Sequence, residues 1–141
     1  PEIRWHEIAH EPGAPVLSEG PWTVTAAPGI HSVPVVGLRV GYQAGENAMP
    51  RVFAYSCDTE YADDIVELAS DADVLVHDAT GPMEGHSSVR DAAAVASRAT
   101  CGRLLLVHLP PAASLTDEMI GEARGIFANV DRGREGGTYQ W

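Results

Sequence analysis

The sequence predicts an α/β fold in which helices cover one sheet, and three observations support this prediction. Short β-rich segments separated by Pro and Gly residues fill the chain as far as about residue 58. After this point, short apolar runs alternate with segments whose apolar residues recur at helical spacing. Apolar residues make up 45% of the 141 residues, which is enough for the hydrophobic core of one domain. Strands that alternate with helices are typical of layered α/β domains.

The first part of the chain predicts four strands. Each is rich in apolar, aromatic or β-branched residues, and Pro or Gly residues interrupt the chain between them. The predicted strands are Ile3–Ile8, Trp22–Thr25, Val35–Tyr42 and Arg51–Cys57.

The second part of the chain predicts three helices and three strands. Ser87 or Ser88 can cap the second helix, because a side-chain oxygen there accepts a hydrogen bond from the first helical turn. Ser114 or Thr116 can cap the third helix in the same way. The helices are expected over Tyr61–Ser70, from the Ser cap to Ala99, and after Thr116. The strands are expected at Val74–Val76, Leu104–Val107 and Thr138–Trp141.

The charge balance argues against one broad class of function. Nine basic residues, all of them Arg, stand against 20 acidic residues, and the formal net charge is −11. A negative surface repels phosphate backbones, so general nucleic-acid binding is not expected. No apolar run reaches the ~18 residues of a membrane span, and the first residues lack the pattern of a signal peptide. We therefore expect no membrane partner. With only two cysteines, Cys57 and Cys101, we expect a reducing compartment, the cytoplasm.

Residues 6–10 read His-Glu-Ile-Ala-His and fit the H-E-x-x-H pattern of zinc proteases. That chemistry needs both histidines on one face of a helix, with the Glu acting as a base. Here the segment runs into Glu11-Pro12-Gly13, so barely two helical turns are available. The longer form of the pattern also lacks its third ligand, because Val16 occupies that position. A zincin-like protease that uses His6 and His10 is therefore a minor alternative.

Three side chains that suit a metal ion lie at the ends of predicted strands or in adjacent loops. His31 follows a Pro-Gly turn, Asp58 comes directly after the fourth strand, and His108 comes directly after Leu104–Val107. Side chains at strand ends converge on one edge of an α/β sheet. Because imidazole and carboxylate are sound ligands for zinc or a similar divalent ion, we expect a metal site there.

Four short motifs follow one another along the second part of the chain. They are Tyr55–Thr59, Ala72–Thr80, Gly85–Ser88 and Leu105–His108. Together they resemble the second half of metallo-β-lactamase-fold hydrolases, and within that superfamily ribonuclease Z and related phosphodiesterases. The upstream stretch Gly29–Pro34 is similar to the one that carries the third metal motif of the family. The resemblance runs from about Ile3 to the C terminus and implies the C-terminal half of a four-layer αββα fold.

The resemblance also implies a binuclear metal site. His31 would bind one of two divalent ions, His108 would bind the other, and Asp58 would bridge them. His86 would stabilise the transition state or protonate the leaving oxygen. Asp78 would hydrogen-bond to that imidazole and orient it. The ions are expected to be zinc, with manganese or iron as alternatives, and no organic cofactor is implied.

The sequence departs from the family pattern in three ways. A Gly usually precedes the aspartate, and here Cys57 does; we expect a small buried residue that points away from Asp58, because neighbours on a strand face opposite sides. The orienting acid is usually Glu, and Asp78 is one methylene shorter. The H-x-H-x-D-H motif of the first half is absent, and His6 and His10 have the wrong spacing to replace it.

The absent motif supplies most of the metal ligands in the family. With His31, Asp58 and His108 alone, each ion would have two protein ligands, whereas a stable zinc site has three or four. We therefore expect residues 1–141 to be a partial domain that ligates its metals incompletely and catalyses poorly by itself. The expected partner is a missing N-terminal half, which the lack of a first Met fits, or a second copy in a homodimer.

The favoured function is a metal-dependent hydrolase that acts on phosphodiester bonds when the domain is complete. A small substrate such as a cyclic nucleotide is favoured over RNA, because the chain is acidic and contains no Lys. Esters or lactones are alternative substrates within the superfamily. The alternative from another class is a catalytically inactive half-fold that serves as an interaction or dimerisation module by covering its open sheet.

Overall fold

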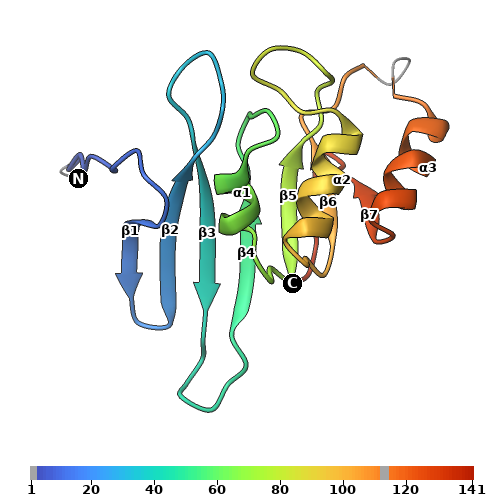
Figure 1. Ribbon diagram of the computed structural model, residues 1–141. Coiled ribbons are helices and arrows are strands. Elements are labelled where there is room, and N and C mark those ends of the chain that lie inside the picture. The colour runs from blue at the N-terminus through green and yellow to red at the C-terminus, as the bar shows by residue number, and fades with distance from the viewer. Residues whose placement is uncertain (1–2, 112–114) are drawn as a thin grey trace.

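The fold is described from a computed structural model over residues 3–111 and 115–141 (Figure 1). Within these ranges the chain forms seven strands and three helices. The strands are β1 (Ala14–Glu19), β2 (Trp22–Pro28), β3 (Val36–Tyr42), β4 (Arg51–Tyr55), β5 (Val74–Asp78), β6 (Leu104–Val107) and β7 (Val130–Arg132). The helices are α1 (Asp63–Leu68), α2 (Val89–Arg98) and α3 (Asp117–Ile126).

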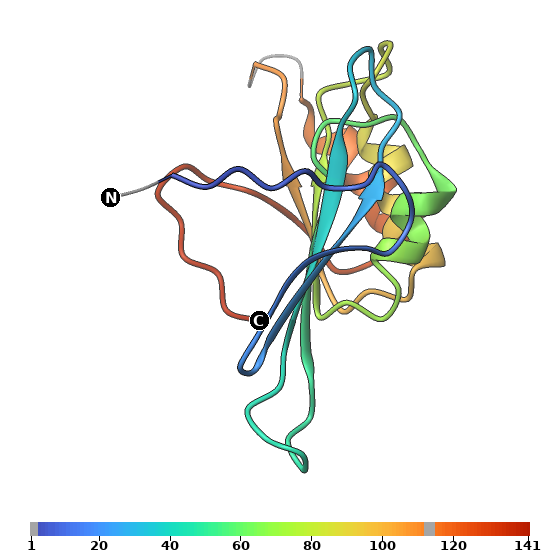
Figure 2. The same ribbon diagram turned by 90° about the vertical axis from the view of Figure 1, so that its left-hand side faces the viewer.

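All seven strands belong to one sheet, in which their spatial order equals their order along the chain. The strands from β1 to β4 pair in antiparallel fashion, and those from β4 to β7 pair in parallel. Each parallel crossover contains one helix, and the three helices cover the same face of the sheet (Figure 2). The predicted α/β fold, with strands first and alternating strands and helices afterwards, is confirmed.

The sequence explains where the longest crossover helices begin. The Ser88 hydroxyl accepts a hydrogen bond from the backbone N–H of Asp91, and the Asp91 carboxylate accepts one from the backbone N–H of Ser88. This capping box starts α2 at the second of the two candidate serines. Thr116 caps α3 by accepting a hydrogen bond from the backbone N–H of Met119. The other candidate, Ser114, lies outside the described residues.

The hydrophobic core lies between the sheet and the helices. Leu75, Leu104 and Leu106 point from the parallel strands into this layer, and each is fully buried. The small residues of α2 pack closely against them. Gly37 of β3 faces α1 so closely that an added Cβ atom would lie 2.9 Å or less from the side chains of Ile65 and Leu68.

The opposite face of the sheet carries no helix within the described residues. Register places Val40 beside Phe53 and Tyr55 beside Val76 on this face, and all four side chains are half-buried. Both terminal segments lie on this side (Figure 2). Trp141 contacts Phe53, with ring centroids 5.8 Å apart. We refer to this apolar surface as the open face.

Two terminal predictions are wrong. Ile3–Ile8 forms no strand, and Trp5 within it is 90% exposed. Thr138–Trp141 forms no strand either, because it turns back over the open face rather than along a sheet edge. Both segments have strand-like composition, but a strand also needs a neighbour to pair with.

Two strands were not predicted, and one predicted helix is shorter than expected. β1 lies in a stretch rich in Pro and Gly, and β7 has only three residues. The helix expected over Tyr61–Ser70 is limited to α1, because Ala62 is still extended at its N-cap. None of the helices in the described parts of the chain has both the length and the apolar content needed to cross a bilayer.

Candidate functional site

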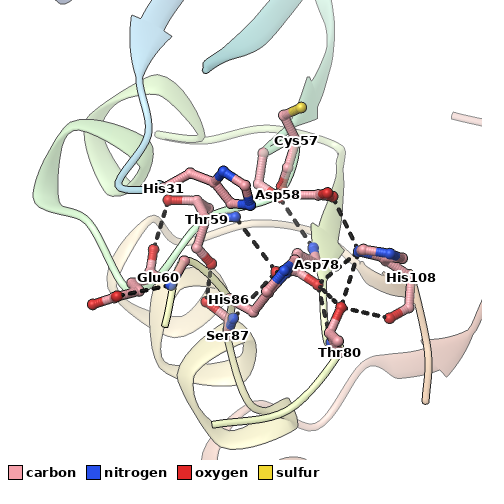
Figure 3. A network of polar contacts seen from close by, with 12 residues as sticks. His31, Cys57, Asp58, Thr59, Glu60, Asp78, Thr80, His86, Ser87 and His108 are labelled. Carbon is pink, nitrogen blue, oxygen red and sulfur yellow. Dashed lines mark hydrogen bonds and ion pairs between the residues drawn. The ribbon is translucent and has the colours of Figure 1, made fainter. Parts of the chain in front are cut away.

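Four loops converge at one end of the sheet. Three of them follow the carboxyl ends of the parallel strands β4, β5 and β6, and the fourth joins β2 to β3 (Figures 1 and 3). The backbone N–H of Glu60 donates to the carbonyl oxygen of Ile30 at 2.9 Å, and the Glu60 carboxylate accepts from the N–H of Gly85 at 2.9 Å. Glu60 therefore ties the loop after β4 to two of the other loops.

Asp78, the last residue of β5, is the centre of the site. Its Oδ1 accepts hydrogen bonds from the Thr80 hydroxyl at 2.7 Å and from the Thr80 N–H at 2.9 Å. Its Oδ2 accepts from His86 Nδ1 at 3.0 Å, from the Ser87 N–H at 3.2 Å and from the Thr59 N–H at 3.4 Å (Figure 3). Burial alone would raise the pKa of Asp78, but hydrogen bonds from Thr80, Ser87 and His86 outweigh it and hold the pKa below its usual value.

His86 is oriented by this carboxylate. Its Nδ1 donates to Asp78, and its side chain is 15% exposed. The shorter side chain of Asp78 therefore still reaches the imidazole, in spite of the missing methylene. Since Nδ1 is used in this way, Nε2 is the nitrogen that can exchange a proton with a bound molecule.

His108 lies beside both carboxylates, at the end of β6. Its Nδ1 is 3.1 Å from Asp58 Oδ1, 3.5 Å from Asp78 Oδ1 and 2.9 Å from the Thr80 hydroxyl oxygen. His108 itself has a positive φ of 51°, which turns the chain directly after the strand. Its side chain is half exposed, so the remaining nitrogen is accessible.

Four of the five predicted site residues come together closely. One candidate ligand atom from each of Asp58, Asp78, His86 and His108 lies within 4.8 Å of the others. Asp78 already accepts five hydrogen bonds, which occupy the lone pairs of its two oxygens. Asp78 is therefore the member of this group least able to bind a metal ion, whereas Asp58, His86 and His108 keep ligand atoms available.

His31 lies next to this group but is not part of it. Its ring packs edge-on against the ring of His86, with centroids 5.1 Å apart (Figure 3). The Val33 N–H donates weakly to its Nδ1 at 3.4 Å. Gly85 makes this approach feasible, because a Cβ atom there would lie 2.8 Å from the His31 ring. That His31 binds metal stays a prediction.

The residue before Asp58 differs from its predicted conformation. β4 ends at Tyr55, so Cys57 lies outside the strand, where the alternation of side chains does not apply. Cys57 has a positive φ of 58° and is half-buried, not buried. Its sulfur points away from Asp78 and His86 (Figure 3). The left-handed backbone gives a physical reason for the Gly that usually occupies this position.

The contacts of two hydroxyl groups, those of Thr80 and Ser87, with the site were not predicted from the sequence. Thr80 contacts Asp78 and His108, and buried Ser87 donates its hydroxyl proton to the carbonyl oxygen of Thr59 at 2.7 Å. Thr80 and Ser87 both lie within the family-like motifs. That placement was the available signal for them.

His77, next to Asp78, faces the core and is fully buried. Its Nδ1 lies 2.8 Å from the carbonyl oxygen of Asp78, which can only accept, so Nδ1 carries the proton. Its Nε2 is the buried side-chain polar atom that finds no partner within the described residues. Burial lowers the pKa of His77, so the ring stays neutral.

The protease-like motif does not form its required structure. Residues 6–10 are not helical, so the two histidines do not share a helix face. His10 instead contacts the carbonyl oxygen of Val35 through Nε2 at 3.0 Å. The helical site of a zincin-like protease is therefore absent from this segment.

Comparison with known protein families gives one clear match. The model of the beta-lactamase superfamily domain matches residues 1–109. Among curated proteins, the probable metallo-hydrolase YhfI of Bacillus subtilis is 32% identical over 126 residues, which cover 85% of this chain and 48% of YhfI. Ribonuclease Z of Nostoc sp. is 38% identical over 109 residues, which cover 68% of this chain and 34% of that enzyme.

Solved structures agree with these sequence matches. The crystal structure of B. subtilis YhfI superposes with a TM-score of 0.72 at 28% identity, over 90% of this chain and 52% of that chain. The short form of human tRNase Z gives a TM-score of 0.63 at 22% identity, over 86% of this chain and 44% of that chain, and so shows a shared fold. The chain spans about half the length of YhfI and a smaller share of the ribonuclease Z sequence.

Proposed function

Because the chain belongs to the metallo-β-lactamase superfamily of hydrolases, we propose that it carries part of the active site of a metal-dependent phosphodiesterase. The observation that supports this proposal is the arrangement of Asp78. This buried carboxylate orients His86 through Nδ1, while Asp58 and His108 next to it keep ligand atoms available. An oriented imidazole beside two metal-binding side chains is the combination that phosphodiester hydrolysis needs.

The available side chains are of the types that bind divalent metal ions, but they are too few to complete the coordination of two ions. Carboxylate and imidazole are ligands that zinc accepts, with manganese or iron as alternatives. We propose that His108 would hold one of two such ions, that His31 would hold the other and that Asp58 would contact both. Such ions, when bound, polarise a phosphoryl group and make hydroxide available near neutral pH. Each ion would have only two ligands from this chain, so the chain alone is expected to hold metal weakly.

The remaining ligands have to come from elsewhere. We propose that a segment carrying an H-x-H-x-D-H motif, or a second copy of the chain, completes the site. Such a segment or copy would also cover the open face, where Val40, Phe53 and Val76 are only partly buried. The alternative, an inactive interaction module, rests on the same open face.

The residues of this chain supply the acid and its support. His86 donates a proton from Nε2 to the leaving oxygen, and Asp78 holds the ring in place through Nδ1. Among substrates, a small phosphodiester is favoured over RNA because of the net charge of −11. The two cysteines are unpaired in the structure, which is compatible with the reducing cytoplasm as the proposed location.

Hydrolysis of bis(p-nitrophenyl) phosphate by the full natural protein in the presence of zinc tests this function. Replacing Asp58 with Ala should abolish turnover, and His86→Ala should lower kcat by about 10²- to 10⁴-fold, the usual contribution of a positioned acid. Glu46→Ala is the matched control, because this exposed residue lies in the β3–β4 loop at the other end of the sheet. Unchanged turnover in the Asp58→Ala protein would refute the proposal.

A further inference from the structure

Thr80 occupies a position between the two halves of the site. Its hydroxyl oxygen lies 2.7 Å from Asp78 Oδ1, 2.9 Å from His108 Nδ1 and 2.9 Å from the His108 carbonyl oxygen (Figure 3). A hydroxyl has one proton to donate and two lone pairs that accept. The three contacts therefore cannot all be donated by Thr80.

The surroundings of His108 Nδ1 decide the direction of these bonds. Its neighbours within 3.5 Å are the Thr80 hydroxyl oxygen, Asp58 Oδ1 and Asp78 Oδ1. Carboxylate oxygens only accept, so the tautomer with the proton on Nδ1 is the one that fits the oxygens around it. The hydroxyl then accepts from Nδ1 and donates to Asp78 Oδ1, which is the nearer and the charged acceptor.

We propose that Thr80 is a positioning residue that links His108 to Asp78 and fixes the His108 tautomer whose Nε2 is free to bind a metal ion. One carboxylate then holds both imidazoles. Asp78 contacts His86 directly through Oδ2 and reaches His108 through Oδ1 and the Thr80 hydroxyl. Metal-binding histidines commonly donate their second N–H to such a partner, which sets their orientation and raises their basicity. This inference rests on the proposed metal-dependent function.

The test compares the zinc affinity of the full protein with Thr80→Val and Thr80→Ser variants, by competition with a chromophoric chelator. Val keeps the branched shape but removes the hydroxyl, and zinc affinity is expected to fall by about 10- to 100-fold. Ser keeps the hydroxyl, so its affinity should stay within about 3-fold of the original protein. Thr25→Val is the matched control, because Thr25 is a half-buried strand residue on β2 that contributes nothing to this site.

A second measurement separates this inference from the proposed function. Nitrogen-15 NMR of the metal-free protein should show His108 protonated at Nδ1, and Thr80→Val should shift the ring toward a mixture of tautomers. An unmodified protein that binds no zinc would refute the proposed metal site, while the tautomer measurement would still test Thr80. The role of Thr80 is overturned if the Val variant keeps both the zinc affinity and the tautomer, or if Ser fails to restore them.

Discussion

At the scale of single residues, neighbouring side chains on β5 serve opposite environments. His77 faces the core and Asp78 belongs to the site, because successive side chains of a strand point to opposite faces. The Asp78 carboxylate is surrounded by hydrogen-bond donors. The His77 imidazole has one hydrogen-bond partner, for Nδ1, and its Nε2 has none within the described residues. The strand thus places a charge that is stabilised next to a ring that must remain neutral.

His77 should make stability depend on pH. Burial lowers its pKa below the usual value of 6.5, so the folded state binds fewer protons than the unfolded state. Stability is therefore full above about pH 6.5 and falls as the pH drops below it, by at most about 1.4 kcal/mol per pH unit for one proton. Urea unfolding midpoints between pH 8 and pH 5 measure this slope.

A non-titrating variant tests the assignment. His77→Gln should be less stable at pH 8, because the contact with the Asp78 carbonyl is weakened, but its stability should change less between pH 7 and pH 5. His10→Gln is the control, since this histidine lies in the exposed N-terminal segment. An equal slope in the His77→Gln protein would contradict the prediction.

The sequence allowed most site residues to be identified, but not the contacts between them. His86 and Asp78 were identifiable because they lie in short ordered motifs, and the structure does bring them within 3.0 Å. Thr80 lies in one of these motifs too, but its contact with His108 could not be predicted, because it spans 28 residues of sequence. The left-handed conformation of Cys57 could not be predicted either. Apolar composition does not show that β4 ends at Tyr55, two residues before Cys57.

At the scale of elements, the two adjacent serines before α2 have different tasks. Ser88 caps the helix, and Ser87 is buried and holds the loop after β4 through the carbonyl oxygen of Thr59. The sequence alone could not decide which serine caps the helix, because the two are neighbours with the same side chain. Only the entry angle of the chain decides which hydroxyl meets the first helical turn.

Removing the cap should cost stability without affecting the site. Ser88→Ala loses the acceptor for the Asp91 N–H and should lower the free energy of unfolding by about 1 kcal/mol. Ser88→Gly should cost only a few tenths of a kcal/mol, because Gly is itself tolerated at this position. Urea unfolding at neutral pH measures both, and equal stabilities of the Ala variant and the original protein would rule out the cap.

At the scale of the whole molecule, the two faces of the sheet differ in coverage. Three helices bury one face, whereas the described residues leave the other with only the terminal segments (Figure 2). Alternation of strand and helix predicted the covered face correctly. It could not place Ile3–Ile8 or Thr138–Trp141, because their positions depend on which sheet edges and faces remain available rather than on their composition.

The open face should drive association of the 141-residue chain. We expect sedimentation velocity at tens of micromolar to show species larger than one chain, because a continuous apolar surface of this kind is unfavourable in water. Val40→Arg should reduce this association. Met49→Arg should not, because Met49 is exposed in the β3–β4 loop, beyond the strands that form the open face.

The size of the associated species distinguishes the candidate partners. A discrete dimer would favour a second copy as the natural cover, and indefinite aggregates would favour a missing half-domain. A chain that stays monomeric, or a Val40→Arg chain that associates as strongly as the original, would contradict a role for the open face.

The strands lie in the sheet in the same order as in the sequence, and this has a consequence for folding during synthesis. Every strand finds its neighbour one connection away, so no pairing has to wait for a distant part of the chain. During synthesis, each newly emerged strand can add to an edge that already exists. The site, by contrast, draws on the β2–β3 loop and on the loops that follow β4, β5 and β6, and these loops can meet only after β6 has joined the sheet. Assembly of the scaffold can therefore proceed stepwise along the nascent chain, with the reactive end completed late.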